Sequence, residues 1–501
     1  MKQLIVMGLD VGTSSCKAAV MDGNGAVLSQ SFREYQLLSP RPGWFEMNPH
    51  AVWDACKQAI TAAAQRSERS IDALAAASFG EAAVLLDKIG EPRRDSIFFT
   101  DIRGNEFVSE LDDRLGVSAV TQWTGMPVNG MYTLPKLLWL ARHSPEVLDK
   151  TAVMLPFGGY VNYMLTGRAV TDPSLASRTL MFNRHTMTWD DRLFKLAGIS
   201  GDILPDVIPA GQAVGEMLPD VAAELGFKNR PLVVSGCHDQ VAAAIGAGVM
   251  TANSAVDGVG SAECITVMLP SDADTARLHR HNICAEPYAI EGTYVSLAFN
   301  NTGGSASRWY LDTFKEGLKE HSMVKGINAF DALNAQISEN PSPLLFLPYL
   351  SGSGTPHMDA NAVGALLGLT VNTTGADIYR ALVEGLCFEM RYNLDLLRQS
   401  GVDPPELAVS GGGVAEALLH IKAGILKIPL YTLSNPQSGN TGLAMLCAVA
   451  LREFGSLGQA SEAMVRRKRI FEPKRQNSGL YDEHYEQYKR MYQCTKAVLH
   501  G

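Results

Sequence analysis

The stretch LIVMGLDVGTSSCKAAVMDGNGAVLSQSF, residues 4–32, decides the fold at the start of the chain. Leu4–Leu9 and Cys16–Met21 are apolar runs of strand length, and the turn Gly12–Ser15 separates them. The sequence DGNG at 22–25 is a hairpin turn that leads to a third strand. The apolar residues that follow take helical spacing. This order predicts an α/β fold that begins with antiparallel strands.

The stretch AVDGVGSAECITVM, residues 255–268, repeats this opening half a chain later. Asp257 takes the place of Asp10, and the pair Gly260-Ser261 takes the place of Gly12-Thr13 after an adjustment of one residue. Apolar strands flank both turns. A repeat at this distance indicates a duplicated unit.

The chain has 501 residues, which is enough for two large domains, and we place them at 1–248 and 249–501. A hydrophobic content of 46% excludes general disorder, and a net charge of −9 argues against a nucleic-acid or anionic-membrane binder. The basic run 466–469 is read as a solvated face. The absence of a membrane-length apolar run and the scattered cysteines predict a cytoplasmic protein.

The two glycine-containing turns suit phosphate groups. Backbone N–H groups in such turns converge on an anion, and the hydroxyls of Thr13, Ser14 and Ser261 add donors. Lys17 adds a positive charge beside the first turn, and Gly260 opens the second. The alternative is a pair of ordinary hairpins.

Two aspartates are candidates for the chemistry. Asp10 ends an apolar strand, where a carboxylate needs hydrogen bonds, water or a cation such as Mg²⁺; the alternative is a structural Asp that caps its own turn. Asp239 lies where a strand meets a helix, just before the expected domain boundary. A carboxylate there is suited to accept a proton from a hydroxyl that attacks a phosphoryl group, and the alternative is a helix-capping Asp.

Together these segments resemble the FGGY family of carbohydrate kinases, within the hexokinase–actin–sugar kinase superfamily. The matching segments follow the family's order over nearly the whole chain, and include GLDVGTS at 8–14, PGWFEMNP at 42–49, DIR at 101–103, LPYLSG at 347–352 and SGGG at 410–413. The resemblance implies two duplicated ribonuclease-H-like (actin-like ATPase) domains with an interdomain cleft. It also implies ATP-dependent phosphoryl transfer to a sugar or polyol, with a homodimer as the expected assembly.

The resemblance also assigns residues. Asp239 matches the catalytic base, and Asp10 matches the residue that holds Mg²⁺ through water. The expected acceptor site consists of Gly80, Glu81, Asp101, Asp239 and Gln240. The expected ATP site consists of Thr13, Ser14, Lys17, Gly260, Ser261, Gly304, Arg308, Gly412, Gly413 and Glu416. Arg308 and Glu416 stand where relatives often have amides.

The sequence leaves two classes of acceptor substrate open. Glu81 and the pair Asp239-Gln240 resemble glycerol kinases, whereas Gly80 stands where those enzymes have an Arg. The segment at 42–44 looks equally like xylulose kinases. We favour a ketopentose such as xylulose, with a glycerol- or erythritol-type polyol as the alternative. A hypothesis of another class is an actin-like ATPase that phosphorylates no sugar.

Overall fold

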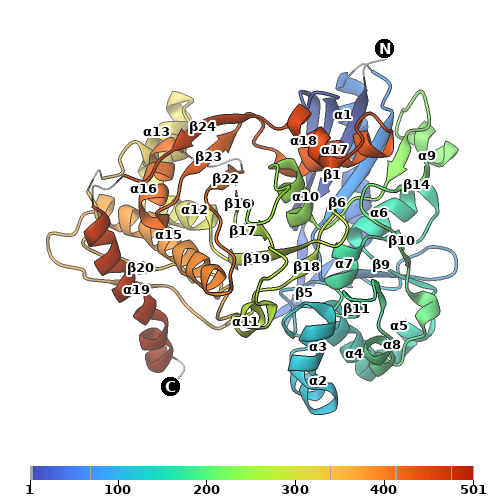
Figure 1. Ribbon diagram of the computed structural model, residues 1–501, viewed down its shortest axis with the longest axis horizontal. Helices are drawn as coiled ribbons and strands as arrows, with labels where there is room; N and C mark the ends of the chain where they lie inside the picture. Colours follow the sequence, from blue (N-terminus) through green and yellow to red (C-terminus); the bar gives the residue numbers. More distant parts are fainter. Residues whose placement is uncertain (1–3, 68, 339, 412–414, 475–476, 500–501) are drawn as a thin grey trace. The chain divides into compact units, whose positions relative to one another are not determined.

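The computed structural model describes residues 4–67, 69–338, 340–411, 415–474 and 477–499 (Figure 1). The chain forms two compact units. The first unit consists of Met1–Met250, Cys284–Val295 and Gln437–Arg466, and the second unit consists of Thr251–Ile283, Ser296–Pro436 and Arg467–Gly501. Two segments from the second half of the sequence therefore fold with the first unit.

A six-stranded sheet forms the centre of the first unit, in the order β14-β15-β6-β1-β2-β3. Its strands are β1 (Ile5–Val11), β2 (Ser15–Asp22), β3 (Val27–Glu34), β6 (Ala73–Ser78), β14 (Ala213–Glu216) and β15 (Leu232–Val234). β1 runs antiparallel to β2 and parallel to β6, and β6 is parallel to β15. The predicted antiparallel opening is therefore confirmed.

The two faces of β1 meet different helices because side chains alternate along a strand. Met7 and Leu9 belong to the core that includes residues of α1 (Pro49–Ser67) and α6 (Phe157–Thr166). Gly8 and Asp10 lie on the opposite face and approach α17 (Ser438–Ala450).

The helices α10 (Asp239–Gly246) and α17 pack closely together, over the upper end of the first unit in Figure 1. A Cβ atom at Gly246 would lie 1.8 Å from the carbonyl oxygen of Ser438, and one at Gly442 would lie 2.1 Å from that of Ala242. Only glycine permits this approach, which holds α17 against β1.

The remaining elements of the first unit surround this sheet. Its short strands are β4 (Leu37–Arg41), β5 (Trp44–Met47), β7 (Ala83–Leu86), β8 (Ser96–Ile97), β9 (Val153–Pro156), β10 (Val170–Thr171), β11 (Phe182–Asn183), β12 (Thr188–Trp189), β13 (Asp206–Val207) and β18 (Glu286–Pro287). Its other helices are α2 (Phe107–Leu115), α3 (Val117–Thr124), α4 (Thr133–His143), α5 (Pro145–Asp149), α7 (Pro173–Ser177), α8 (Asp191–Phe194), η1 (Lys195–Ala197), η2 (Gly201–Ile203), α9 (Pro219–Glu224) and α18 (Leu457–Met464).

The sheet of the second unit repeats the strand order of the first. From its outer edge it runs β24-β23-β22-β16-β17-β19, and β18 pairs with the start of β19. These strands are β16 (Ala255–Val259), β17 (Glu263–Met268), β19 (Tyr294–Asn300), β22 (Leu407–Ser410), β23 (Leu430–Leu433) and β24 (Arg467–Phe471). β16 is antiparallel to β17 and parallel to β22, as β1 is to β2 and β6. The predicted duplication of the opening is confirmed in this topology.

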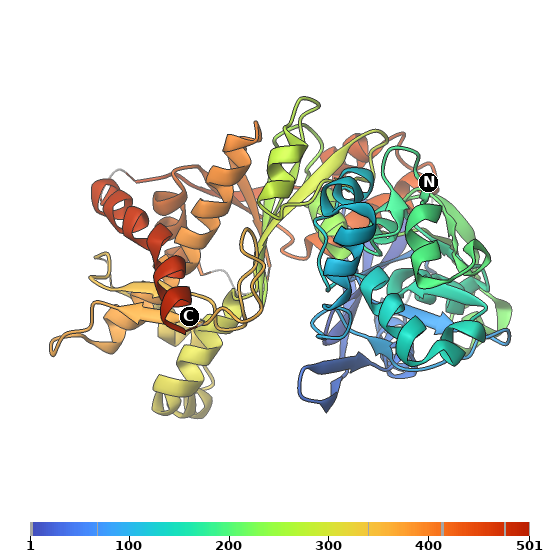
Figure 2. The same cartoon turned by 90° about the horizontal axis from the view of Figure 1, so that it is seen from below.

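The second unit also contains a small sheet and seven helices among the residues that the structure describes. They are β20 (Leu345–Leu347), β21 (Ala365–Leu367), α11 (Thr275–Arg280), α12 (Gly304–Phe314), α13 (Glu316–Lys325), α14 (Ala329–Asn334), α15 (Gly375–Gln399), α16 (Glu416–Leu426) and α19 (Ser478–Leu499). α19 packs beside α15, as both ribbon views show (Figure 1, Figure 2). In the part of the chain that the structure describes, no helix combines the length and the apolar character that a membrane crossing needs.

Candidate active site

Asp239 is the first residue of α10, directly after β15 and its loop. The position before the helix is taken by His238, so Asp239 is not the capping residue. The positive end of the helix dipole favours a negative charge at this place. The side chain of Asp239 is 24% exposed, and its carboxylate is therefore accessible to a substrate.

Asp10 lies close enough to Asp239 for the two carboxylates to repel each other. Burial, and next the charge of Asp239, raise the pKa of Asp10 to about 7, while Lys17 acts in the opposite direction. Asp10 and Lys17 are cross-strand partners on β1 and β2. The Oδ2 atom of Asp10 would lie 3.5 Å from a Cβ at Gly439, so α17 closes over it. Two repelling carboxylates fit a divalent cation, because a cation relieves their repulsion.

Gly80 and Glu81 lie between β6 and β7, and the backbone of Glu81 has φ 67°. This left-handed conformation is unusual for a residue with a side chain and is typical of functional sites. The Thr133 hydroxyl donates to the carbonyl oxygen of Glu81 at 2.7 Å. Arg178 places Nη2 2.7 Å from Glu81 Oε1 and packs directly over Gly80. Burial raises the pKa of Glu81 although Arg178 opposes the shift.

His238 and Glu286 complete the charged groups around the base. His238 Nδ1 lies 2.9 Å from Glu286 Oε1, and His238 Nε2 lies 3.2 Å from Asp239 Oδ1. Arg178 Nη1 lies 3.4 Å from Glu286 Oε2. Glu286 is carried by β18, in the segment of the second sequence half that folds with the first unit.

Of the other expected acceptor residues, Asp101 is bound within a separate cluster. Its carboxylate accepts from the Phe45 N–H at 2.6 Å and from the Arg103 guanidinium at 2.6 to 3.1 Å. The Arg103 guanidinium lies over the Trp44 ring, 4.0 Å from its centroid. Gln240 follows Asp239 in the first turn of α10 and is half-buried. The roles of Asp101 and Gln240 in acceptor binding stay predictions.

The first expected phosphate turn exposes its hydroxyl residues. Thr13 and Ser14 are exposed, while the chain closes behind them through a hydrogen bond of 2.9 Å from Gly12 N–H to Ser15 O. The Tyr35 hydroxyl lies beneath the turn, 2.5 Å from the carbonyl oxygen of Gly12 and 3.1 Å from that of Ser15. Both carbonyl dipoles are thereby held away from the exposed side, which favours an anion there.

The second turn is fastened to the start of α12. Gly260 N–H bonds to Ala262 O at 2.9 Å, and Gly304 N–H donates to Gly260 O at 2.8 Å. The Ser305 hydroxyl donates to Ser261 O at 2.7 Å. Gly260 and Ser261 are exposed. Gly304 therefore supports the turn through its backbone.

A buried ion cluster anchors the same hairpin. Lys422 of α16 pairs with Asp257 of β16 and with Glu263 of β17. Burial, and then the charge of Asp257, raise the pKa of Glu263 to about 7 although Lys422 opposes the shift. Asp257 thus pairs through Oδ2 with a buried lysine inside the second unit, in surroundings unlike those of Asp10.

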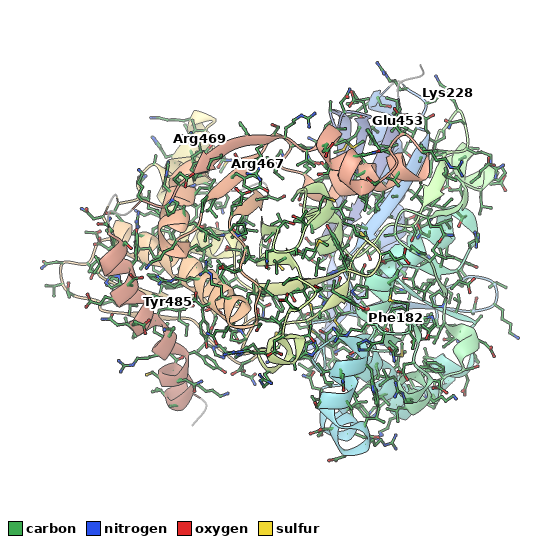
Figure 3. The ribbon with its side chains drawn as sticks, in the orientation of Figure 1. Phe182, Lys228, Glu453, Arg467, Arg469 and Tyr485 are labelled. Carbon is green, nitrogen blue, oxygen red and sulfur yellow. The ribbon has the colours of Figure 1, made fainter. Side chains whose placement is uncertain are left out.

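The remaining expected nucleotide residues are spread over the second unit. The Arg308 guanidinium lies 5.4 Å from the centroid of the Phe330 ring, and Glu416 pairs with Arg469. Figure 3 shows Arg467 and Arg469 on β24, where Arg467 pairs with Glu406. The basic run thus contains ion-paired side chains. Gly412 and Gly413 lie outside the described residues.

Sequence reasoning missed three members of the first unit's charged group: Arg178, His238 and Glu286. His238 adjoins the expected base in sequence, which was a usable signal. Arg178 and Glu286 lie far from it in the chain, and only folding brings them to Glu81 and His238.

Residues 5–246 match the model of the N-terminal domain of the FGGY family of carbohydrate kinases, and residues 259–451 match that of its C-terminal domain. The chain belongs to the FGGY family of carbohydrate kinases. It is an ATP-dependent carbohydrate kinase with the family's actin-like ATPase fold, which confirms the resemblance. The alternative of an ATPase that phosphorylates no sugar is set aside.

Individual FGGY relatives resemble the chain over nearly their full length. A xylulose kinase of Staphylococcus epidermidis (strain ATCC 12228 / FDA PCI 1200) is 29% identical over 99% of this chain and 97% of its own. A glycerol kinase of Acidovorax ebreus (strain TPSY) is 29% identical over 93% of this chain and 94% of its own. The crystal structure of xylulose kinase from Rhodospirillum rubrum has a TM-score of 0.85 at 26% identity, and covers 99% of this chain and 100% of that one.

Proposed function

We propose that this FGGY kinase transfers the γ-phosphate of ATP to a hydroxyl of a ketopentose such as xylulose, with Asp239 as the general base. The observation that carries the proposal is the accessible carboxylate of Asp239 at the start of α10, beside Asp10 and the His238 ring. The whole-chain similarity to several xylulose kinases supports the acceptor class.

In this proposal the acceptor binds to the first unit and the nucleotide to the second. Glu81 binds acceptor hydroxyls, and Asp239 accepts the proton of the hydroxyl that attacks the γ-phosphate. Asp10 would hold Mg²⁺ through water, and Mg²⁺ would offset phosphate charge. The exposed hydroxyls of Thr13, Ser14 and Ser261 and the Lys17 ammonium would bind phosphate oxygens. A homodimer and a cytoplasmic location stay predictions.

One observation favours a polyol such as glycerol or erythritol as the second candidate. Glycerol kinases, which the sequence also resembles, have an Arg directly before the acceptor-site Glu. Here Arg178 supplies a guanidinium 2.7 Å from Glu81 Oε1 although residue 80 is Gly. In this second candidate, the acceptor would meet both the Glu81 carboxylate and the Arg178 guanidinium.

The test is a coupled ADP-release assay over ketoses, aldoses and polyols. We expect acceptor-dependent ADP release with one ketopentose or one short polyol, and the ratio of kcat/KM values decides between the two candidates. Asp239→Asn should abolish transfer and leave ATP binding nearly intact, because the carboxamide cannot accept the proton. Near-normal turnover by Asp239→Asn would remove Asp239 from the role of base.

A further inference from the structure

A row of alternating acidic and basic side chains runs through the first unit from Glu81 to Asp239. Its order is Glu81, Arg178, Glu286, His238, Asp239, and successive charged atoms lie 2.7, 3.4, 2.9 and 3.2 Å apart. The four side chains before Asp239 are at most 9% exposed, and that of Glu286 is completely buried. The carboxylate of Asp239, at 24%, is the most exposed of the five.

Glu286 occupies the centre of this row and divides its two oxygens between two cations. Oε1 faces His238 Nδ1, and Oε2 faces Arg178 Nη1. A buried carboxylate needs such partners because an unpaired charge in the interior is costly. Burial acts to lower the pKa of His238, but Glu286 and then Asp239 outweigh it, and the net shift is upward. The ring is thereby favoured in the form that donates from both nitrogens.

We propose that Glu286 is a positioning residue for the kinase reaction, which holds His238 against Asp239 and Arg178 against Glu81. The inference rests on the proposed roles of Asp239 as base and Glu81 as acceptor ligand. Glu286 touches neither of them. It acts through His238 on the orientation of the base, and through Arg178 on the orientation of the acceptor carboxylate.

A purely stabilising role explains the arrangement less well. Apolar side chains of similar volume often replace buried ion pairs with no loss of stability. This row instead ends on the base Asp239 at one side and on Glu81, with its left-handed backbone, at the other. It therefore fixes the positions of these two carboxylates relative to each other. Small misplacements of reacting groups cost large factors in rate, so a rigid row of this kind bears directly on turnover.

Three variants separate the two halves of the row. In His238→Asn, the side-chain amide lies near the position of Nδ1, and no group remains at the position of Nε2. This variant should therefore lower kcat about 10- to 100-fold and leave the acceptor KM nearly unchanged. Arg178→Lys should mainly raise the acceptor KM, since it loosens Glu81. Glu286→Gln should lower kcat and also raise the acceptor KM. In all three variants, the KM for ATP should match that of the wild type.

Coupling and rescue test whether Glu286 acts through its neighbours. The double variant Glu286→Gln/His238→Asn should have about the kcat of the more impaired single variant, because both changes break one connection. His238→Gln, whose amide reaches toward the Nε2 place, should recover part of the kcat lost in His238→Asn. Glu384→Gln is the matched control, since it removes a carboxylate that is 1% exposed and paired with Arg380 in the second unit.

Two patterns would overturn the inference. The first is wild-type kcat and acceptor KM in both Glu286→Gln and His238→Asn. The second is a loss of activity that is fully explained by a loss of folded protein in thermal unfolding, and that is as large in Glu384→Gln as in the variants of the row. Failure of the proposed function looks different, because wild-type protein would then show no acceptor-dependent ADP release, or Asp239→Asn would turn over normally.

Discussion

The side chain of Arg178 fills the space beside Gly80. A Cβ atom at residue 80 would lie 2.7 Å from Arg178 Cγ and 2.8 Å from Arg178 Cβ, closer than real side chains come. The guanidinium that neighbours Glu81 thus reaches its place only because residue 80 has no side chain.

Gly80→Ala should therefore impair acceptor binding. The added methyl group displaces Arg178 from Glu81, so we expect a raised acceptor KM, an unchanged KM for ATP and a destabilisation of about 1–3 kcal/mol from overpacking. Steady-state kinetics and thermal unfolding measure these effects. Gly317→Ala is the control, because a Cβ at Gly317 in α13 would meet open space. Equal acceptor KM values for Gly80→Ala and the wild type would contradict the prediction.

Much of the fold follows from local sequence, and the site follows only partly. The apolar runs and turns of residues 4–32 determine β1, β2 and β3, and the repeat at 255–268 determines β16 and β17. Strand alternation alone puts Asp10 on the face opposite Leu9. Arg178 and Glu286 were not predictable in this way, since nothing local marks a residue whose partner lies about 50 to 100 positions away in the chain.

The Tyr35 hydroxyl supports the first phosphate turn, so its removal should weaken ATP binding. Tyr35→Phe removes the donor to the carbonyl oxygen of Gly12, which can then turn toward the exposed side and repel phosphate. We expect a KM for ATP raised severalfold, with the acceptor KM unchanged. Tyr485→Phe, labelled in Figure 3, is the control, because its buried hydroxyl donates to Asp395 at 2.7 Å on α15. A shift in the acceptor KM alone would argue against the turn as a phosphate site.

The buried cluster of Lys422, Asp257 and Glu263 should make a large contribution to the stability of the second unit. Lys422→Met removes the only cation of this cluster and leaves two carboxylates buried against each other. We expect a loss of about 3–5 kcal/mol in the free energy of unfolding, measured with urea. Lys427→Met, which removes an exposed pair with Asp482, should cost less than about 1 kcal/mol. Similar losses in the two variants would show that the cluster has no special role.

Glu389 should make the stability of the second unit depend on pH. Burial raises its pKa from 4.5 to about 7, although the hydroxyls of Tyr488 and Tyr349 donate to it and oppose the shift. Between these two values the folded state binds more protons than the unfolded state, so stability falls as pH rises from about 4.5 to about 7. Above that range the buried charge costs on the order of a few kcal/mol.

Glu389→Gln keeps an acceptor for both tyrosine hydroxyls and removes the charge. Its melting temperature should therefore exceed that of the wild type by more at pH 8 than at pH 5, when both proteins are followed by scanning calorimetry. Glu320→Gln, at an exposed position on α13, serves as the control and should run parallel to the wild type at every pH. If the difference between Glu389→Gln and the wild type were the same at pH 5 and pH 8, the carboxyl group would carry no pH-dependent cost, and Tyr349 and Tyr488 would be stabilising the charged form fully.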